Sequence, residues 1–236
     1  MKNDSVTTFG GWCGILIGMV TVLTGVAVLL LPADQQLGSP GARQLPSIAA
    51  NPTMLILVHI GFTLVAVLGF GFIPALSNWV RGETDGLLRW TSSLAYLGYA
   101  VWAIASVNTI SRLPRVAEAF VAGDASTKAA LVADWRSSMD PYALWSFGGV
   151  GLFILVASWL ALRGGRFAPW HSYLGVAVGI LFLLVPIAFI FRITFLFTLV
   201  DVLGGILSAI WYFWSGQVMR GSMMPGTTRL RTAEAR

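Results

Sequence analysis

Charged side chains and thiols are scarce in this sequence. Of its 236 residues, 11% are charged, whereas soluble domains typically carry about 25%. The single cysteine, Cys13, has no partner for an internal disulfide or a cysteine metal cage. The two histidines, His59 and His171, lack ligand partners at the spacing of a metal site, and the predicted topology places His59 near the outer face and His171 near the inner face of the membrane. We therefore expect no metal, haem or other cofactor.

Catalytic motifs are also missing. Gly148, Gly149 and Gly151 lie inside an apolar run that lacks the Lys-Ser/Thr pair of a phosphate-binding loop. No serine stands in a nucleophile elbow, so we assign no catalytic residue. The net charge of +5 comes from basic residues scattered among loops and a tail. Because this scatter forms no basic patch, we expect no nucleic-acid partner.

Apolar residues, in contrast, make up 56% of the chain. A soluble core of this length does not hide so much apolar surface, which indicates an integral membrane protein. The apolar runs are each about 22 residues long, or roughly 33 Å as helices, enough to cross a bilayer. We predict an all-α, polytopic bundle of six transmembrane helices in a domain covering residues 1–219. The predicted spans are 10–31, 53–80, 88–110, 141–162, 170–191 and 194–215.

The first span also fits a signal peptide, but we expect a retained helix. Its charged start rests on Lys2 alone, which Asp4 offsets, and its apolar run is longer than a signal peptide needs.

Three hydrophilic segments join or follow the spans. Residues 32–52 are rich in proline and glycine, so we predict a loop without a long helix. Residues 112–140 carry apolar pairs at helical spacing, such as Val116 and Phe120. We predict one or two amphipathic helices lying on the outer membrane face, which serve as a connector, a lid or a docking surface. Residues 220–236 are predicted to form a disordered basic tail.

Lysines and arginines set the predicted orientation. The short loops and the tail, which contain Arg81, Arg163 and Arg166, form the more basic set. By the positive-inside rule, both termini then face the cytoplasm and segment 112–140 lies on the other side. Tryptophans favour the interface between membrane and water, and several lie near predicted span ends: Trp12, Trp79, Trp90, Trp145, Trp170 and Trp214.

Glycines recur on single helix faces in the first and last spans. Gly14 and Gly18 form a GxxxG pattern, which lets two helix backbones approach closely. We expect Gly14, Gly18, Gly25, Gly204 and Gly205 to serve helix packing. The expected partners of the bundle are membrane lipid and a further membrane protein or a second copy of the chain.

Asp201 is the most unusual residue of the last span, because an intramembrane carboxylate is costly and suggests function. It shares one helix face with polar or small residues at three- and four-residue steps: Thr194, Thr198, Gly205, Ser208 and Tyr212. This face is predicted to point into the bundle, toward polar residues at the outer ends of other spans. The predicted ligand-binding or proton/cation site consists of Asp201, His59, Asn108, Arg192, Thr198 and Trp102.

Several functions fit such a site. The first is a non-enzymatic membrane protein that binds a small or lipidic ligand in an outward-facing polar pocket, or that acts as a subunit of a membrane complex. The alternative is a transport component, either substrate-binding or coupled to protons or cations. The third is an intramembrane enzyme with Asp201 as base, which needs a second titratable group within about 3 Å. A structural hypothesis stays open beside them, with Asp201 buried in a pair with Arg192 or His59.

Two local patterns accompany the six spans. Pro169-Trp170 leads into Leu174-Gly175, and the last span runs from Gly204 through Trp211 to Gly216. With these patterns the chain resembles a family of uncharacterised bacterial six-span membrane proteins, a domain of unknown function. The resemblance covers most of the chain. It implies a multi-pass protein of the bacterial cytoplasmic (inner) membrane and no catalytic residues.

Overall fold

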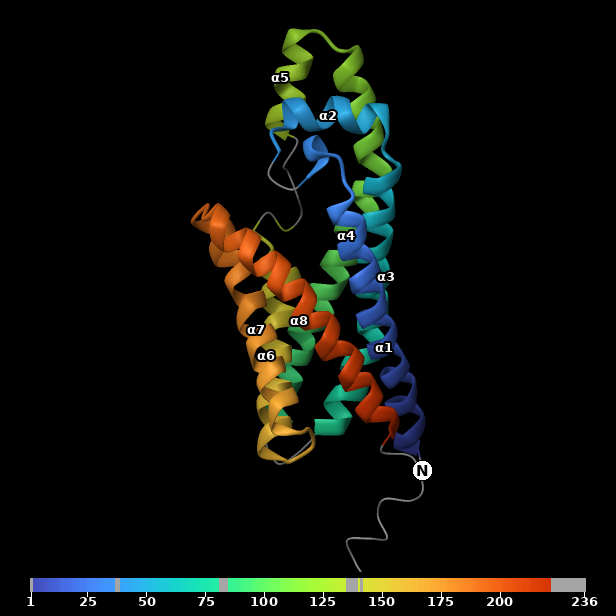
Figure 1. Cartoon of the computed structure of the whole chain (residues 1–236), viewed down its shortest axis with the longest axis vertical. Coiled ribbons are helices and arrows are strands. Elements are labelled where there is room, and N and C mark those ends of the chain that lie inside the picture. The colour runs from blue at the N-terminus through green and yellow to red at the C-terminus, as the bar shows by residue number, and fades with distance from the viewer. Residues whose placement is uncertain (1, 37–38, 81–84, 135–139, 141, 222–236) are drawn as a thin grey trace, which may run out of the picture.

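The computed structural model describes residues 2–36, 39–80, 85–134, 140 and 142–221, and these residues form helices without a strand (Figure 1). The long helices are α1 (Lys2–Leu29), α3 (Thr53–Val80), α4 (Asp85–Ala122), α6 (Val150–Arg163), α7 (Pro169–Ile190) and α8 (Thr194–Gly221). The short ones are the 3-10 turn η1 (Ala33–Gln35), α2 (Gly41–Ala50), α5 (Ala125–Asp134) and the π-helical segment η2 (Leu144–Gly149), which continues into α6. Residues 135–139 of the predicted outer segment and 222–236 of the predicted tail lie outside this description.

Six of these helices are long and apolar enough to cross a membrane, which confirms the predicted six-span, all-α class. The fourth of them joins η2 and α6, from Leu144 to Arg163. The described ends of α1 and α8 lie at the same end of the bundle (Figure 1). Chain direction therefore alternates through the six helices as the spans predict.

Exposed apolar side chains mark the depth of the bilayer. On α4 most of them fall between Leu87 and Val107, with Val121 alone further along the helix. That stretch is about 30 Å long, which matches the hydrocarbon core. Trp12, Trp90 and Trp170 are exposed near the end of the bundle that holds the termini. This is the position of an aromatic belt at a membrane interface.

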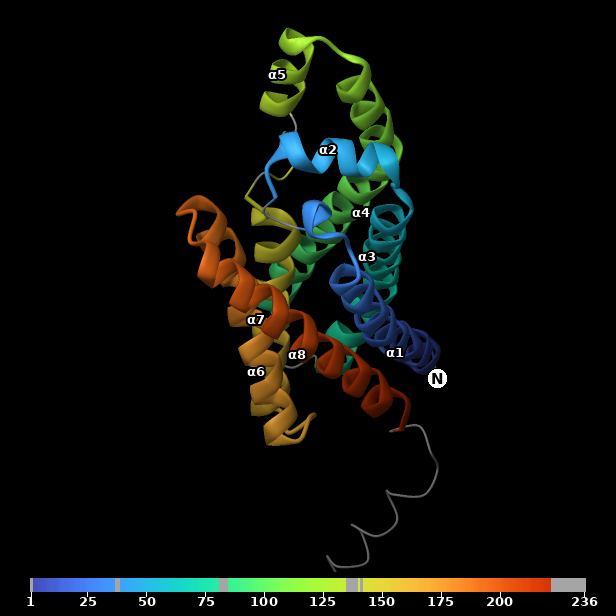
Figure 2. The same ribbon diagram turned by 45° about the horizontal axis from the view of Figure 1, so that its top comes forward.

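Helices α1 and α8 cross where glycines remove side chains. A Cβ added to Gly14 would lie 2.9 Å from the carbonyl oxygen of Tyr212, and one added to Gly18 would lie 2.7 Å from that of Ala209. Beyond this crossing the two helices diverge, and the upper half of the α7–α8 hairpin lies apart from α1 and α3 (Figures 1 and 2). A Cβ added to Gly25 or to Gly205 would meet no atom within 4 Å. Gly204 makes only ordinary contact, at 3.6 Å from the ring of Phe182.

The core at membrane depth is aromatic. Phe72, Tyr99, Trp211 and Tyr212 are buried, and the hydroxyl groups of Tyr99 and Tyr212 share a hydrogen bond of 2.5 Å. The ring of Phe72 meets those of Trp211 and Tyr212 at centroid distances of 5.8 and 5.1 Å. These rings fill the space between α3, α4 and α8.

Outside the spans, η1, α2, the outer part of α4 and α5 form a helical cap (Figure 1). Leu45 and Ile48 of α2 are fully buried against Leu113 and Phe120 of α4. The side chain of Gln35 donates from Nε2 to backbone oxygens of α2 and of the residue after it. The predicted loop over 32–52 therefore contains a helix that the sequence did not indicate. This helix, α2, has ten residues, includes Pro46, and packs through two apolar side chains.

The prediction that the third span ends near residue 110 and gives way to helices on the membrane surface is wrong for the helix itself. α4 continues unbroken through Pro114 to Ala122, and at 38 residues it is about 57 Å long. Hydropathy falls after Val107 although the helix continues. Gly123 does follow its last residue, and α5 folds back beside it (Figure 1).

Candidate functional site

A groove of about 400 Å³ lies where α5 folds back against the outer part of α4. Its α4 residues recur at three- and four-residue steps and so share one face of the helix. They are Asn108, Ser111, Arg112, Arg115, Val116 and Ala119. Leu131 of α5 lines the groove from the other wall.

The groove carries two guanidinium groups on consecutive turns of α4. Nη2 of Arg112 donates to the carboxylate of Asp134 in α5, and this ion pair joins the two walls. The side chains of Arg112 and Asp134 are 42% and 52% exposed, and ion pairs at such exposure contribute little. Arg115 makes no ion pair within the described part of the chain. Two cations facing one carboxylate leave the groove positive.

The wall formed by α5 is lightly held. α5 has no buried residue, and its apolar contacts come from the partly buried Leu131 and Val132. At its start, the carboxylate of Asp124 accepts hydrogen bonds from the backbone N–H of Thr127 at 2.8 Å and from the hydroxyl of Ser126 at 2.9 Å. These bonds, first of all the one from the Thr127 backbone, lower the pKa of Asp124 to about 2.

Depth and polarity vary along the groove. Asn108 follows Val107, where the main series of exposed apolar side chains on α4 ends and only Val121 lies beyond, so the groove starts at the edge of this apolar stretch. Ala119 lies about 17 Å further out along the helix axis. The polar residues occupy the end near the membrane, whereas Val116, Ala119 and Leu131 occupy the outer end.

Of the sequence-predicted site residues, Asn108 lines this groove, while His59 and Trp102 lie elsewhere. His59 faces a narrow crevice between α2, α3 and α4, together with Thr109 and Pro114. Its Nδ1 is buried and has no hydrogen-bond partner among the described atoms. The ring of Phe62 lies 5.7 Å from that of His59 and 5.8 Å from that of Trp102, so it separates the two. Trp102 itself stacks on Tyr99 at 6.2 Å in the aromatic core.

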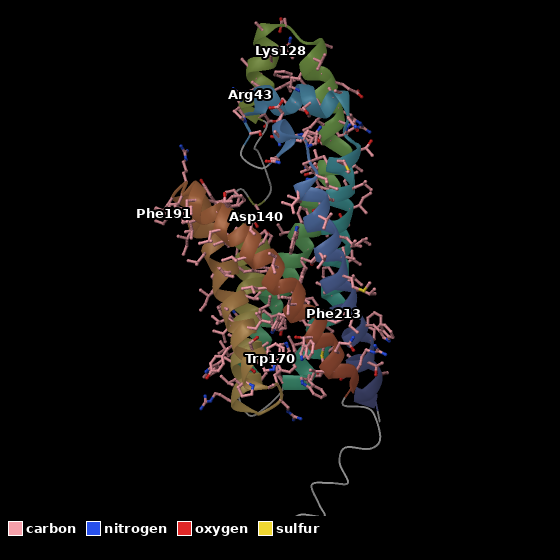
Figure 3. The ribbon with its side chains drawn as sticks, viewed as in Figure 1. Arg43, Lys128, Asp140, Trp170, Phe191 and Phe213 are labelled. Carbon is pink, nitrogen blue, oxygen red and sulfur yellow. The ribbon has the colours of Figure 1, made fainter. Side chains whose placement is uncertain are left out.

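The remaining predicted residues belong to the α7–α8 hairpin. Arg192 is exposed and has a φ of 55° in the turn between the two helices. Thr198 is exposed on α8, and the side chain of Asp201 lies outside the described atoms. Figure 3 shows Phe191, the neighbour of Arg192, at the tip of this hairpin, well away from Arg43 and Lys128 of the cap. The structure thus brings neither Arg192 nor Thr198 to Asn108 or His59.

Neither Arg112 nor Arg115 was among the predicted site residues. Both lie beyond residue 110, where the third span was predicted to end. The signal was available: the steps that join Asn108 to Ser111 and Arg112 continue to Arg115 without a break.

A second polar cluster lies buried between α6, α7 and α8. Nε2 of His171 lies 3.1 Å from the hydroxyl of Ser215. Gly175 makes room for Ser158 and Trp211, because a Cβ at Gly175 would lie 2.0 Å from Ser158 Oγ and 2.3 Å from Trp211 Nε1. Both of those atoms lack a hydrogen-bond partner among the described residues. This cluster is closely packed and serves the contact of three helices.

By fold, the chain belongs to the class of all-helical membrane proteins with six candidate spans. Within the described ranges, no three His, Cys, Asp or Glu side chains gather as a metal site would require. Comparison with protein-family models, with curated proteins and with solved structures gave no match.

Proposed function

We propose that this chain is a non-enzymatic integral membrane protein that binds a small or lipidic anion in the groove between α4 and α5. The observation that carries the proposal is the pair of guanidinium groups, Arg112 and Arg115, over one groove of about 400 Å³. That volume lies within the range of small-molecule sites. Guanidinium groups bind carboxylate and phosphate oxygens through paired hydrogen bonds.

The proposed location is the bacterial inner membrane, with both termini in the cytoplasm and the groove on the outer side. The resemblance to the uncharacterised bacterial six-span family supports the location, and the basic short loops support the orientation. At the end of the bundle that holds the termini, the guanidinium of Arg220 lies 3.6 Å from the ring centroid of Trp12, and that of Arg163 lies 4.8 Å from that of Trp159. Arginine over tryptophan suits an interface rich in cytoplasmic charge.

We favour binding over transport or intramembrane catalysis. Those alternatives need a polar chamber at membrane depth, and the described side chains at that depth include the packed rings of Phe72, Tyr99 and Trp211. The groove between α4 and α5, in contrast, has both open volume and an excess of positive charge. A docked membrane partner remains compatible with this function, since Gly25 and Gly205 stand open on α1 and α8.

Calorimetric titration of the protein in neutral phosphatidylcholine nanodiscs with phenyl phosphate tests the proposal. Wild type is expected to bind, and Arg115→Gln is expected to lose about 1.5–3 kcal/mol, because a hydrogen bond to a charged group is lost. This loss weakens binding by roughly tenfold or more. Arg192→Gln is the matched control, since Arg192 is exposed outside the groove. Equal affinity of wild type and Arg115→Gln would remove the basis of the proposal.

A further inference from the structure

The groove is polar toward the membrane and apolar away from it. Arg112 and Arg115 lie nearer the bilayer than Val116, Ala119 and the facing Leu131 of α5 do. A bilayer lipid has the opposite order, because its chains run inward from its headgroup. A lipid phosphate placed at Arg112 would therefore leave the apolar end of the groove unfilled.

We propose that the ligand is a water-soluble amphiphilic anion, with a carboxylate or phosphate monoester joined to an apolar group, and that its oxyanion replaces the Asp134 carboxylate beside Arg112. This rests on the proposed function of the groove. The apolar group lies against Val116 and Leu131, and the oxyanion lies between Arg112 and Arg115. Asn108 and Ser111 provide neutral hydrogen-bonding groups at the same end.

The exchange at Arg112 requires that Asp134 leave easily. Its ion pair with Arg112 is about half exposed, and such pairs contribute little to stability. Because α5 has no buried residue, it can shift without opening a core. Asp134 thus occupies the anion position until a ligand takes it.

Three variants separate this exchange from simple charge attraction. Asp134→Asn removes the competing carboxylate and is expected to bind phenyl phosphate about threefold tighter, as an exposed pair allows. Asp134→Glu keeps the charge and is expected to bind like wild type. Arg112→Gln is expected to weaken binding by about tenfold. Circular dichroism and size-exclusion chromatography verify that each variant is folded.

Ligand class is tested with two probes and two membranes. Phenyl phosphate is expected to bind about tenfold tighter than inorganic phosphate, because burying an apolar ring adds to the charge interaction. Leu131→Ser is expected to reduce the difference in affinity between phenyl phosphate and inorganic phosphate, because it removes an apolar contact for the ring. Nanodiscs containing phosphatidylglycerol are expected to leave the affinity for phenyl phosphate equal to that in neutral phosphatidylcholine nanodiscs, measured at 0.15 M salt where long-range charge effects are screened.

The outcomes point to different errors. If Asp134→Asn binds no tighter than wild type while Arg115→Gln still weakens binding, the exchange is overturned and the proposed function stands. Equal affinities for phenyl phosphate and inorganic phosphate would overturn the proposal that the ligand carries an apolar group. Loss of phenyl phosphate binding in phosphatidylglycerol nanodiscs would assign the anion to a lipid headgroup. If no probe binds wild type, the proposed function itself falls.

Discussion

At the scale of single residues, the absence of a side chain decides several helix contacts. Gly175 admits the hydroxyl of Ser158 and the indole of Trp211 to the surface of α7, and Gly18 admits the backbone of α8 to α1. The sequence indicated Gly14 and Gly18 through their spacing. It gave no comparable signal at Gly175, because the side chains that fill its space come from α6 and α8, and the register between those helices is not visible in one dimension.

Gly175→Ala is expected to destabilise the protein by about 1–3 kcal/mol, because the new Cβ would overlap two side-chain atoms in a closely packed region. The matched control is Gly205→Ala, whose Cβ would meet nothing within 4 Å. That substitution is expected to be neutral or to stabilise by about 0.5–1 kcal/mol, as replacing glycine does inside a helix. Thermal unfolding in detergent, followed by tryptophan fluorescence, measures both. Equal melting temperatures for the two variants would show that Gly175 is not tightly packed.

At the scale of elements, a segment can become polar and still remain helical, as the outer part of α4 does. The sequence indicated the apolar part of α4 but not where the helix ends, since a fall in hydropathy does not break backbone hydrogen bonds. Pro114 forms part of the helix and does not end it. The polar face of outer α4 could be followed from Asn108 to Arg115 in the sequence. The groove itself could not be predicted, because it also needs α5 to fold back against that face, and the turn at Gly123 does not say against which face α5 packs.

The start of α5 is expected to be sensitive to acid. Hydrogen bonds lower the pKa of Asp124 to about 2, below the value near 3.9 of an unstructured aspartate. Stability from this cap is therefore fully present above about pH 4 and is lost as the pH falls through 2. Hydrogen exchange of the α5 amides is expected to accelerate over that window, whereas Asp124→Ala exchanges rapidly at all pH values. Unchanged α5 protection between pH 4 and 2 would contradict the role of this cap.

At the scale of the whole molecule, the six-span class follows from composition and run length alone, and it is confirmed. The predicted grouping of polar residues around Asp201 depended on how the spans are arranged around one another. Hydropathy carries no information on that arrangement. α8 leans away from α3 above its crossing with α1, so the turn between α7 and α8 lies apart from α3 (Figures 1 and 2).

Cysteine labelling tests the orientation. With Cys13 replaced by alanine, Ser126→Cys in the cap is expected to react with a membrane-impermeant maleimide added to spheroplasts. Gly164→Cys, in the turn between α6 and α7, is expected to react only after the membrane is opened. Both positions are exposed, and they lie at opposite ends of the bundle (Figure 1). The reverse labelling pattern would place the cap in the cytoplasm.

Because α4 is one continuous helix of 38 residues, a change in its tilt moves both of its ends. The helix that lines the groove at its outer end is the same helix that carries Arg89 and Trp90 at the opposite membrane face. Tilting a rod of about 57 Å by about 10° moves one end by on the order of 10 Å relative to the other. If the proposed ligand changed the tilt of α4, the end of the helix near Arg89 would move together with the end at the groove.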